Sequence, residues 1–236
     1  MKKVKYFSTV GMHDNIDEEF LPPDYTIFPQ KFQLELDTKS RYSKCPALKE
    51  WGKNTWIFYQ SFDLEFKNIS ARQQLISNNL HTEVFNNYIY IEPSWLDGKN
   101  PNIQLNTVNY FWTDEKDVWI EQIPHPLISR YGIEVISGTF PISVWHRPVV
   151  CGCDIIDHDV SIKIPRGTPL FYIRFYSQKS NSLFDLERKL PPEDFMLAEK
   201  QDTNLKKFTP FGSWDVIQDR LKKEESSCPF NFLRRK

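Results

Sequence analysis

The chain of 236 residues has few cysteines and few glycines. Its four cysteines, Cys45, Cys151, Cys153 and Cys228, are too sparse to hold a chain of this size together as a disulfide scaffold. We therefore expect free thiols in a reducing compartment. Eight glycines are also too few for a collagen-like or low-complexity chain.

Long apolar runs and an excess of one charge are missing as well. No window approaches the roughly eighteen apolar residues of a membrane-spanning helix, and Met1–Ser8 lacks the apolar core of a signal peptide. Acidic and basic residues nearly cancel, at 31 against 30. This balance excludes a general attraction to nucleic acid or to an anionic membrane, so neither is expected as a partner, although a local basic patch is compatible with it.

Several catalytic and nucleotide-binding signatures are absent too. The sequence contains no Gly-x-Ser-x-Gly elbow, no Walker loop and no dinucleotide fingerprint. These absences remove the commonest sequence-level indications of a hydrolase or a nucleotide-dependent enzyme.

β-rich segments separated by turn residues dominate what is present. Aromatic residues make up 15% of the chain, which suits sheets packed with large rings. The most informative stretch holds the runs Ile142–Trp145, Val160–Ile164 and Leu170–Phe175. We expect the last two runs to pair antiparallel across Pro165–Pro169, because Gly167 can take a positive φ there. The pattern predicts a mainly β protein with a β-sandwich or jelly-roll-like body.

Other segments receive individual predictions. Strands are expected at Lys3–Thr9, Thr55–Phe62, Asp63–Lys67, Val84–Glu92, Asn102–Trp112, Val118–Gln122 and Gly132–Ile136. The strands at 102–112 and 118–122 are predicted to form a hairpin. Helices are expected at Ala71–Asn79, Ser182–Leu190, Pro192–Lys200 and Ser213–Glu225.

Three regions follow from this pattern. Residues 1–50 are rich in proline and are predicted to form an N-terminal wrapping arm, residues 51–176 form the β body, and residues 177–236 form a helical C-terminal arm. In the last predicted helix Trp214, Ile217 and Leu221 fall on one face. A short helix with such a stripe is stable only when the stripe is buried, so the arm is expected to dock on the body.

The segments Tyr42–Ile57, Ser61–Leu64 and Ile164–Ile173 resemble an uncharacterised protein family of large tailed phages of marine bacteria. A more distant likeness is to an uncharacterised bacterial family with the same order of elements. The resemblance covers roughly residues 1–175 and implies a source and a fold, with no known activity. The location that this resemblance implies is the cytoplasm of an infected host cell or the virion.

The joint around Pro165–Pro169 also resembles the closing strands of dUTPase-type jelly rolls. The Asp-containing catalytic motif and the Gly-rich phosphate-binding tail of those enzymes have no counterpart in this sequence. Likeness of fold alone supports no chemistry.

One motif points to iron chemistry. His81 and Glu83 have the His-x-acid spacing of a non-haem iron facial triad, and His146 is the candidate third metal ligand. Arg147 lies where an oxygenase would hold the carboxylate of 2-oxoglutarate. The competing interpretation is an exposed His81 and a packed His146.

Two further groups have metal-ligand chemistry. Asp154, Asp157 and Asp159 are oxygen donors for a divalent cation, but such residues also serve as solvated turn residues. Cys151 and Cys153 would face one side of a strand as a zinc pair, completed by Cys45 or Cys228, or would be buried thiols.

These observations favour a non-enzymatic phage-associated protein that contacts a protein partner, as a virion component or a host-directed adaptor. One alternative is an iron(II)/2-oxoglutarate-dependent oxygenase on a double-stranded β-helix that uses His81, Glu83 and His146 as metal ligands. A second is a small-molecule or nucleotide-binding β-barrel. Whether the protein is catalytic, and its oligomeric state, stay open at the level of the sequence.

Overall fold

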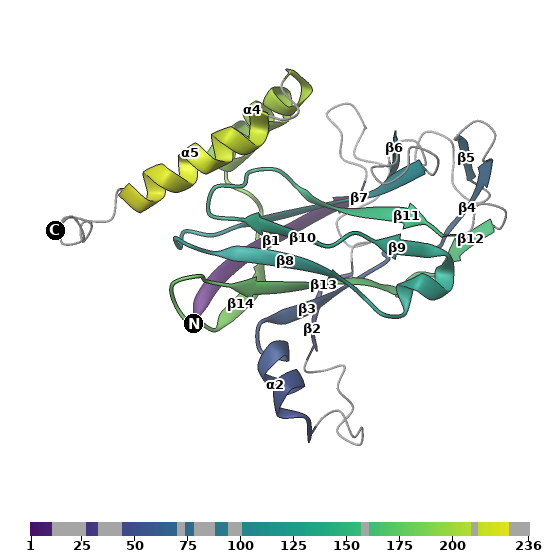
Figure 1. Ribbon diagram of the computed structural model, residues 1–236, viewed down its shortest axis with the longest axis horizontal. Coiled ribbons are helices and arrows are strands. Elements are labelled where there is room, and N and C mark those ends of the chain that lie inside the picture. Colours follow the sequence, from purple (N-terminus) through teal and green to yellow (C-terminus); the bar gives the residue numbers. More distant parts are fainter. Residues whose placement is uncertain are drawn as a thin grey trace.

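The structure is a computed structural model that describes residues 1–10, 27–32, 44–69, 74–77, 88–93, 101–156, 161–208 and 212–226. The expected mainly β fold is confirmed. The strands of the described residues form three sheets, and the last two helices project from one end of this β body (Figure 1).

The largest sheet contains strands from both ends of the chain. Its order is β14 (Phe184–Arg188), β1 (Lys2–Val10), β7 (Pro101–Trp112), β11 (Val149–Ile155) and β9 (Ile133–Val135), and β6 (Ile89–Pro93) also pairs with β7. β1 is parallel to β14 and antiparallel to β7. This sheet therefore draws strands from all three of the regions expected from the sequence.

Two further sheets complete the β body. The order of the second sheet is β10 (Gly138–Pro141), β8 (Trp119–Pro124), β13 (Pro169–Tyr176), β3 (Thr55–Tyr59) and β2 (Gln30–Lys31). The third consists of β12 (Ser161–Ile164), β4 (Leu64–Ile69) and β5 (Gln74–Ser77). A 3₁₀ helix, η4 (Ile128–Tyr131), precedes β9.

The two larger sheets share one hydrophobic core. Phe58 of β3 stacks on Phe171 of β13, with ring centroids 5.0 Å apart. Phe111 of β7, from the other sheet, meets Phe58 edge-on at 5.8 Å. Aromatic rings thus fill the space between the sheets, in agreement with the aromatic-rich composition.

Strands β3 and β13 are buried on both faces. Their outward-facing residues Ile57 and Tyr172 are covered by Phe32 and by Trp51 of α2 (Pro46–Gly52). Ring centroids of Trp51 and Tyr172 lie 5.2 Å apart. This second covering layer explains why successive residues of β3, from Thr55 to Phe58, are all buried rather than alternately buried and exposed.

The predicted hairpin between Val160–Ile164 and Leu170–Phe175 is wrong, although β12 and β13 are both strands. β12 pairs with β4, and β13 pairs with β3 and β8. The turn between them bonds instead to the β3–β4 junction: Gly167 N donates to Gln60 O and Gln60 N donates to Thr168 O, both at 2.8 Å. The turn is therefore a corner at which two paired strands pass together into another sheet. Gly167 takes the expected positive φ, at 82°.

The predicted hairpin of β7 with β8 is also wrong. β7 pairs with β1, β6 and β11, whereas β8 pairs with β10 and β13 in the other large sheet. Both strands turn apolar side chains to the shared core, so the connection at 113–118 crosses from one sheet to the other.

Two predicted helices are strands where the structure describes them. In the predicted helix at 71–79, residues 74–77 form β5, which pairs with β4. In the predicted helix at 182–190, Phe184 and Leu186 are buried alternately in β14, which is the period of a strand. Tertiary pairing with β1 therefore overrides the helical propensity of this segment.

The last two helices confirm the sequence prediction. They are α4 (Glu193–Phe208) and α5 (Gly212–Ser226). Within the expected stripe, Ile217 is buried and Leu221 is half-buried; the side chain of Trp214 lies outside the described residues. Among the residues described, no helix is long and apolar enough to cross a membrane.

Candidate functional site

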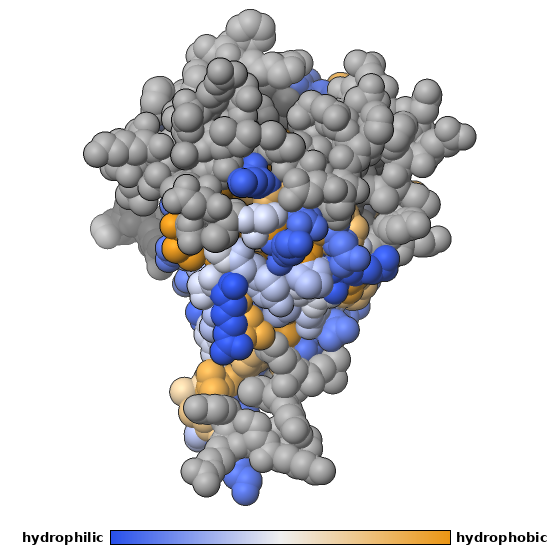
Figure 2. Space-filling view, turned by 90° about the vertical axis from the view of Figure 1, so that its right-hand side faces the viewer, coloured by the Kyte–Doolittle hydropathy of each residue, from blue (hydrophilic) through white to orange (hydrophobic). Residues whose placement is uncertain are grey.

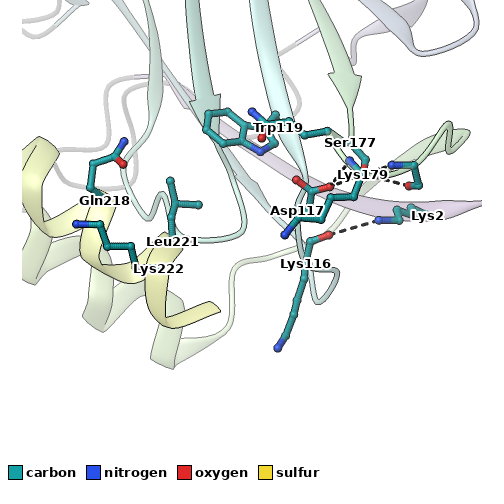
Figure 3. A pocket seen from close by; sticks show the side chains of 11 residues that line it. Lys2, Lys116, Asp117, Trp119, Ser177, Lys179, Gln218, Leu221 and Lys222 are labelled. Atoms are coloured by element: carbon teal, nitrogen blue, oxygen red, sulfur yellow. Dashed lines mark hydrogen bonds between the residues drawn. The ribbon is translucent and has the colours of Figure 1, made fainter. Parts of the chain in front are cut away.

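A cleft of about 460 Å³ lies between α5 and the rim of the β body. Figure 3 shows Gln218, Leu221 and Lys222 of α5 on one side and residues of the body on the other. Side chains from four separate parts of the chain line it: Lys2, Lys116, Asp117, Trp119, Ser177, Gln178, Lys179, Ser180, Gln218, Leu221 and Lys222.

Asp117 organises the body side of the cleft. It follows β7 and adopts a left-handed backbone with φ of 56°, a conformation that Asp tolerates better than most residues. Its Oδ2 accepts a hydrogen bond from Ser177 Oγ at 2.6 Å and another from Lys179 N at 2.9 Å. The carboxylate thereby joins the segment before β8 to the loop after β13.

Trp119 gives the body side an aromatic surface. It is the first residue of β8 and pairs in register with Tyr176, the last residue of β13. The two rings stack with centroids 6.4 Å apart. This support fixes the orientation of the indole beside the lysines.

Positive charge prevails in the cleft, because four lysines line it and Asp117 is the only acidic side chain among the lining residues described. Lys2 Nζ lies 3.4 Å from Lys116 O and 4.0 Å from Glu115. Lys222 lies 3.6 Å from Asp219 on the exposed face of α5. In Figure 3 the side chain of Lys116 extends away from Trp119 and Leu221.

A partly buried charge cluster holds α5 in place. Arg220 of α5 donates to both carboxylate oxygens of Asp202 in α4, at 2.8 and 2.7 Å. His146 Nδ1, from the segment before β11, lies 3.4 Å from Asp202 Oδ2 and 3.2 Å from Arg220. Arg220 also reaches Val144 O at 3.4 Å. The cluster thus connects both helices to the β body.

Electrostatics keep Asp202 and Arg220 ionised. Burial raises the pKa of Asp202, but hydrogen bonds from His146 and Arg220 outweigh it and hold the pKa well below its usual range. The hydrogen bond to Asp202 raises the pKa of Arg220 in turn. The two groups therefore form a charged, bidentate pair.

Aromatic packing adds a second attachment. Phe195 of α4 is buried with Tyr110 and Trp112 of β7, and its ring centroid lies 5.6 Å from that of His146. Arg147 lies over Trp145, with Cζ 4.4 Å from the ring centroid, and burial lowers its pKa. Arg147, expected to hold 2-oxoglutarate in the oxygenase alternative, thus packs on an indole.

The described residues do not test whether the three proposed iron ligands converge. His81 and Glu83 lie outside them, so their convergence with His146 stays a prediction. His146 itself is engaged by Arg220 and Asp202. A cationic guanidinium 3.2 Å from Nδ1 is unfavourable for a metal ion at that nitrogen.

The cysteine pair has the expected orientation. Cys151 and Cys153 of β11 are both buried, with their sulfurs 3.5 Å apart. Cys45 precedes α2, and Cys228 lies outside the described residues. Among the three acidic residues considered as cation ligands, Asp154 accepts a hydrogen bond from Asn102 at 3.1 Å. Asp157 and Asp159 lie outside the described residues. No group of three or more His, Cys, Asp or Glu among the described side chains could hold a metal ion.

The cleft and the charge cluster behind it were not predictable from local sequence patterns. Lys2 and Lys179 lie 177 positions apart in the numbering, and each of them is an ordinary surface residue locally. Asp202 and Arg220 lie on different helices whose partnership no local pattern encodes. The sequence indicated only that a local basic patch is compatible with a chain whose acidic and basic residues nearly cancel.

The surface elsewhere is mixed. Figure 2 views the end of the body that carries β4 and β12, and shows hydrophilic residues interspersed with small hydrophobic areas among the described atoms. Hydrophobic atoms lie at the sides of the body and also on the lower extension, at the height where Figure 1 places α2.

Comparison with known proteins returned no match for this chain among protein-family models, curated proteins or solved structures.

Proposed function

We propose that this protein is a non-enzymatic, phage-associated binding protein that contacts a protein partner through the cleft between α5 and the β body. In this proposal the body is a jelly-roll-like β-sandwich, and the helices serve as one wall of the binding site. The resemblance to a family of large tailed phages supports the association with phage. It also supports a location in the infected host cytoplasm or the virion.

The observation that carries the proposal is the way α5 is held. Arg220, Asp202 and His146 fix the helix to the body, yet a cleft of about 460 Å³ stays between Leu221 and the β8–β13 rim. Binding sites in proteins commonly have volumes of a few hundred Å³ and walls that are largely formed before binding.

Site-specific photo-crosslinking tests the proposal. A photoreactive residue replaces Gln218 inside the cleft, and a matched protein carries it at Lys67 on β4, at the other end of the body. Both are expressed in infected cells, and the cross-linked proteins are identified by mass spectrometry. We expect one dominant partner at position 218 that is absent at position 67 and that binds the purified protein. Identical products at both positions would contradict the proposal.

A further inference from the structure

The two walls of the cleft carry the same kinds of polar groups. Lys179 and Gln178 come from the loop after β13, and Lys222 and Gln218 come from α5. Each wall thus offers at least one ammonium group and one side-chain amide, and Lys2 and Lys116 add to the positive charge of the body wall. An amide both donates and accepts hydrogen bonds, as the backbone of a bound peptide does.

We infer that the cleft binds an acidic segment of a partner polypeptide. Carboxylates of the segment would pair with Lys179 and Lys222 on opposite walls, while its backbone would meet Gln178 and Gln218. Trp119 and Leu221 supply an apolar surface for the aliphatic part of Asp or Glu side chains. The inference rests on the proposed function and specifies the chemistry of the partner.

Charge complementarity favours a carboxylate-bearing ligand. The cleft has four lysines, and Asp117 is already bonded to Ser177 and to the backbone of Lys179. An acidic ligand therefore gains attraction to the lysines, whereas a basic ligand meets repulsion.

A nucleic acid is the less suitable anion. Binding along a phosphate backbone needs an extended basic surface, and the chain as a whole has a formal net charge of −1. Single strands are held by successive stacked bases, but Trp119 is the only aromatic side chain among the lining residues described. A short acidic peptide fits a local cleft of this kind better.

Fluorescence anisotropy with defined probes tests the inference. The probes are a labelled hexaglutamate peptide, a hexaglutamine peptide of equal length, and a labelled oligodeoxythymidylate of the same charge as hexaglutamate. We expect hexaglutamate to bind most tightly and to weaken as salt is added, because the contacts are exposed ion pairs. Charge reversal by Lys179→Glu or by Lys222→Glu should weaken hexaglutamate binding about fivefold in each case. The double variant should weaken it more than about tenfold.

The control variant Lys67→Glu makes the same charge change on exposed β4, far from the cleft. It should leave hexaglutamate binding unchanged, and circular dichroism should show that all variants stay folded. Equal weakening by Lys67→Glu, or equal or tighter binding of the oligonucleotide, would overturn the inference. Cross-linking of a partner at Gln218 without any preference for hexaglutamate would overturn the inference alone and leave the proposed function standing.

Discussion

Arg220 and Asp202 form a bidentate ion pair between α5 and α4, with the two N···O distances at 2.8 and 2.7 Å. The Asp202 side chain is 9% exposed and the Arg220 side chain 29%. A pair so placed is stronger than an exposed one, because little water competes for the two parallel hydrogen bonds. We therefore expect this contact to help hold α5, and with it the α5 wall of the cleft, in position.

Replacing Asp202→Asn should loosen the helix pair. The amide cannot accept both hydrogen bonds, and the Arg220 charge loses its counter-ion in a partly buried place, so we expect a cost of about 2–3 kcal/mol. Hydrogen exchange should become faster in α5 and in the end of α4, while the central strands keep their protection. The control Asp219→Asn, on the exposed Lys222 pair, should change stability by less than about 0.5 kcal/mol. Unchanged exchange in the Asp202 variant would show that α5 is held by other contacts.

Acidification should release the same helices. The pKa of Asp202 in the folded protein lies below its unfolded value, so its stabilising contribution is complete above about pH 4. That contribution is lost as the pH falls from this value toward the folded pKa. Urea unfolding at pH 6, 4 and 3, compared between the wild type and Asp202→Asn, measures it. The gap in unfolding free energy between the two proteins should narrow with falling pH, and a constant gap would contradict this assignment.

Gly167→Ala should destabilise the corner that joins the sheets. The residue has φ of 82°, where a side chain costs about 1–2 kcal/mol of backbone strain. A Cβ there would meet nothing within 4 Å among the described atoms, so strain accounts for the whole expected effect. Gly152→Ala is the control, since its Cβ would make only an ordinary contact, 3.8 Å from Ile136. Equal free energies of unfolding for the two variants would refute the special role of the corner.

The paired thiols of β11 should resist reagents in the folded state. The sulfur of Cys151 and complete burial both raise the pKa of Cys153, which disfavours the reactive thiolate. In a variant with Cys45→Ala and Cys228→Ala, a thiol-reactive chromophore should label neither remaining cysteine in buffer and both in denaturant. Rapid labelling in buffer would mean that the core around β11 opens readily.

Local patterns were sufficient where an element's own residues decide its structure. The strand at 2–10 and the helices α4 and α5 have periodicities that survive folding. The positive φ of Gly167 follows from its place between prolines in a tight turn. The sequence also indicated the side-by-side arrangement of Cys151 and Cys153, because alternate residues of a strand face one side.

Pairing between distant segments was beyond such patterns. The Pro165–Pro169 segment has the residue types typical of a hairpin turn. Its backbone nevertheless forms hydrogen bonds with the backbone of Gln60, and the chain passes there into another sheet. Residues 184–188 have helical composition but extend beside β1 because Phe184 and Leu186 gain burial there. In both places long-range burial outweighed local preference.

By itself the sequence determined the mainly β class, the two C-terminal helices and the near balance of charge, because these depend on composition and on short-range periodicity. Only the tertiary structure decided that Lys2, Lys179 and Lys222 share one cleft. It also decided that Asp202 pairs with Arg220, since both arrangements depend on the sheet order and on the docking of α5. A lysine on the surface is indistinguishable in sequence from any other, and its role arises from the neighbours that folding brings to it.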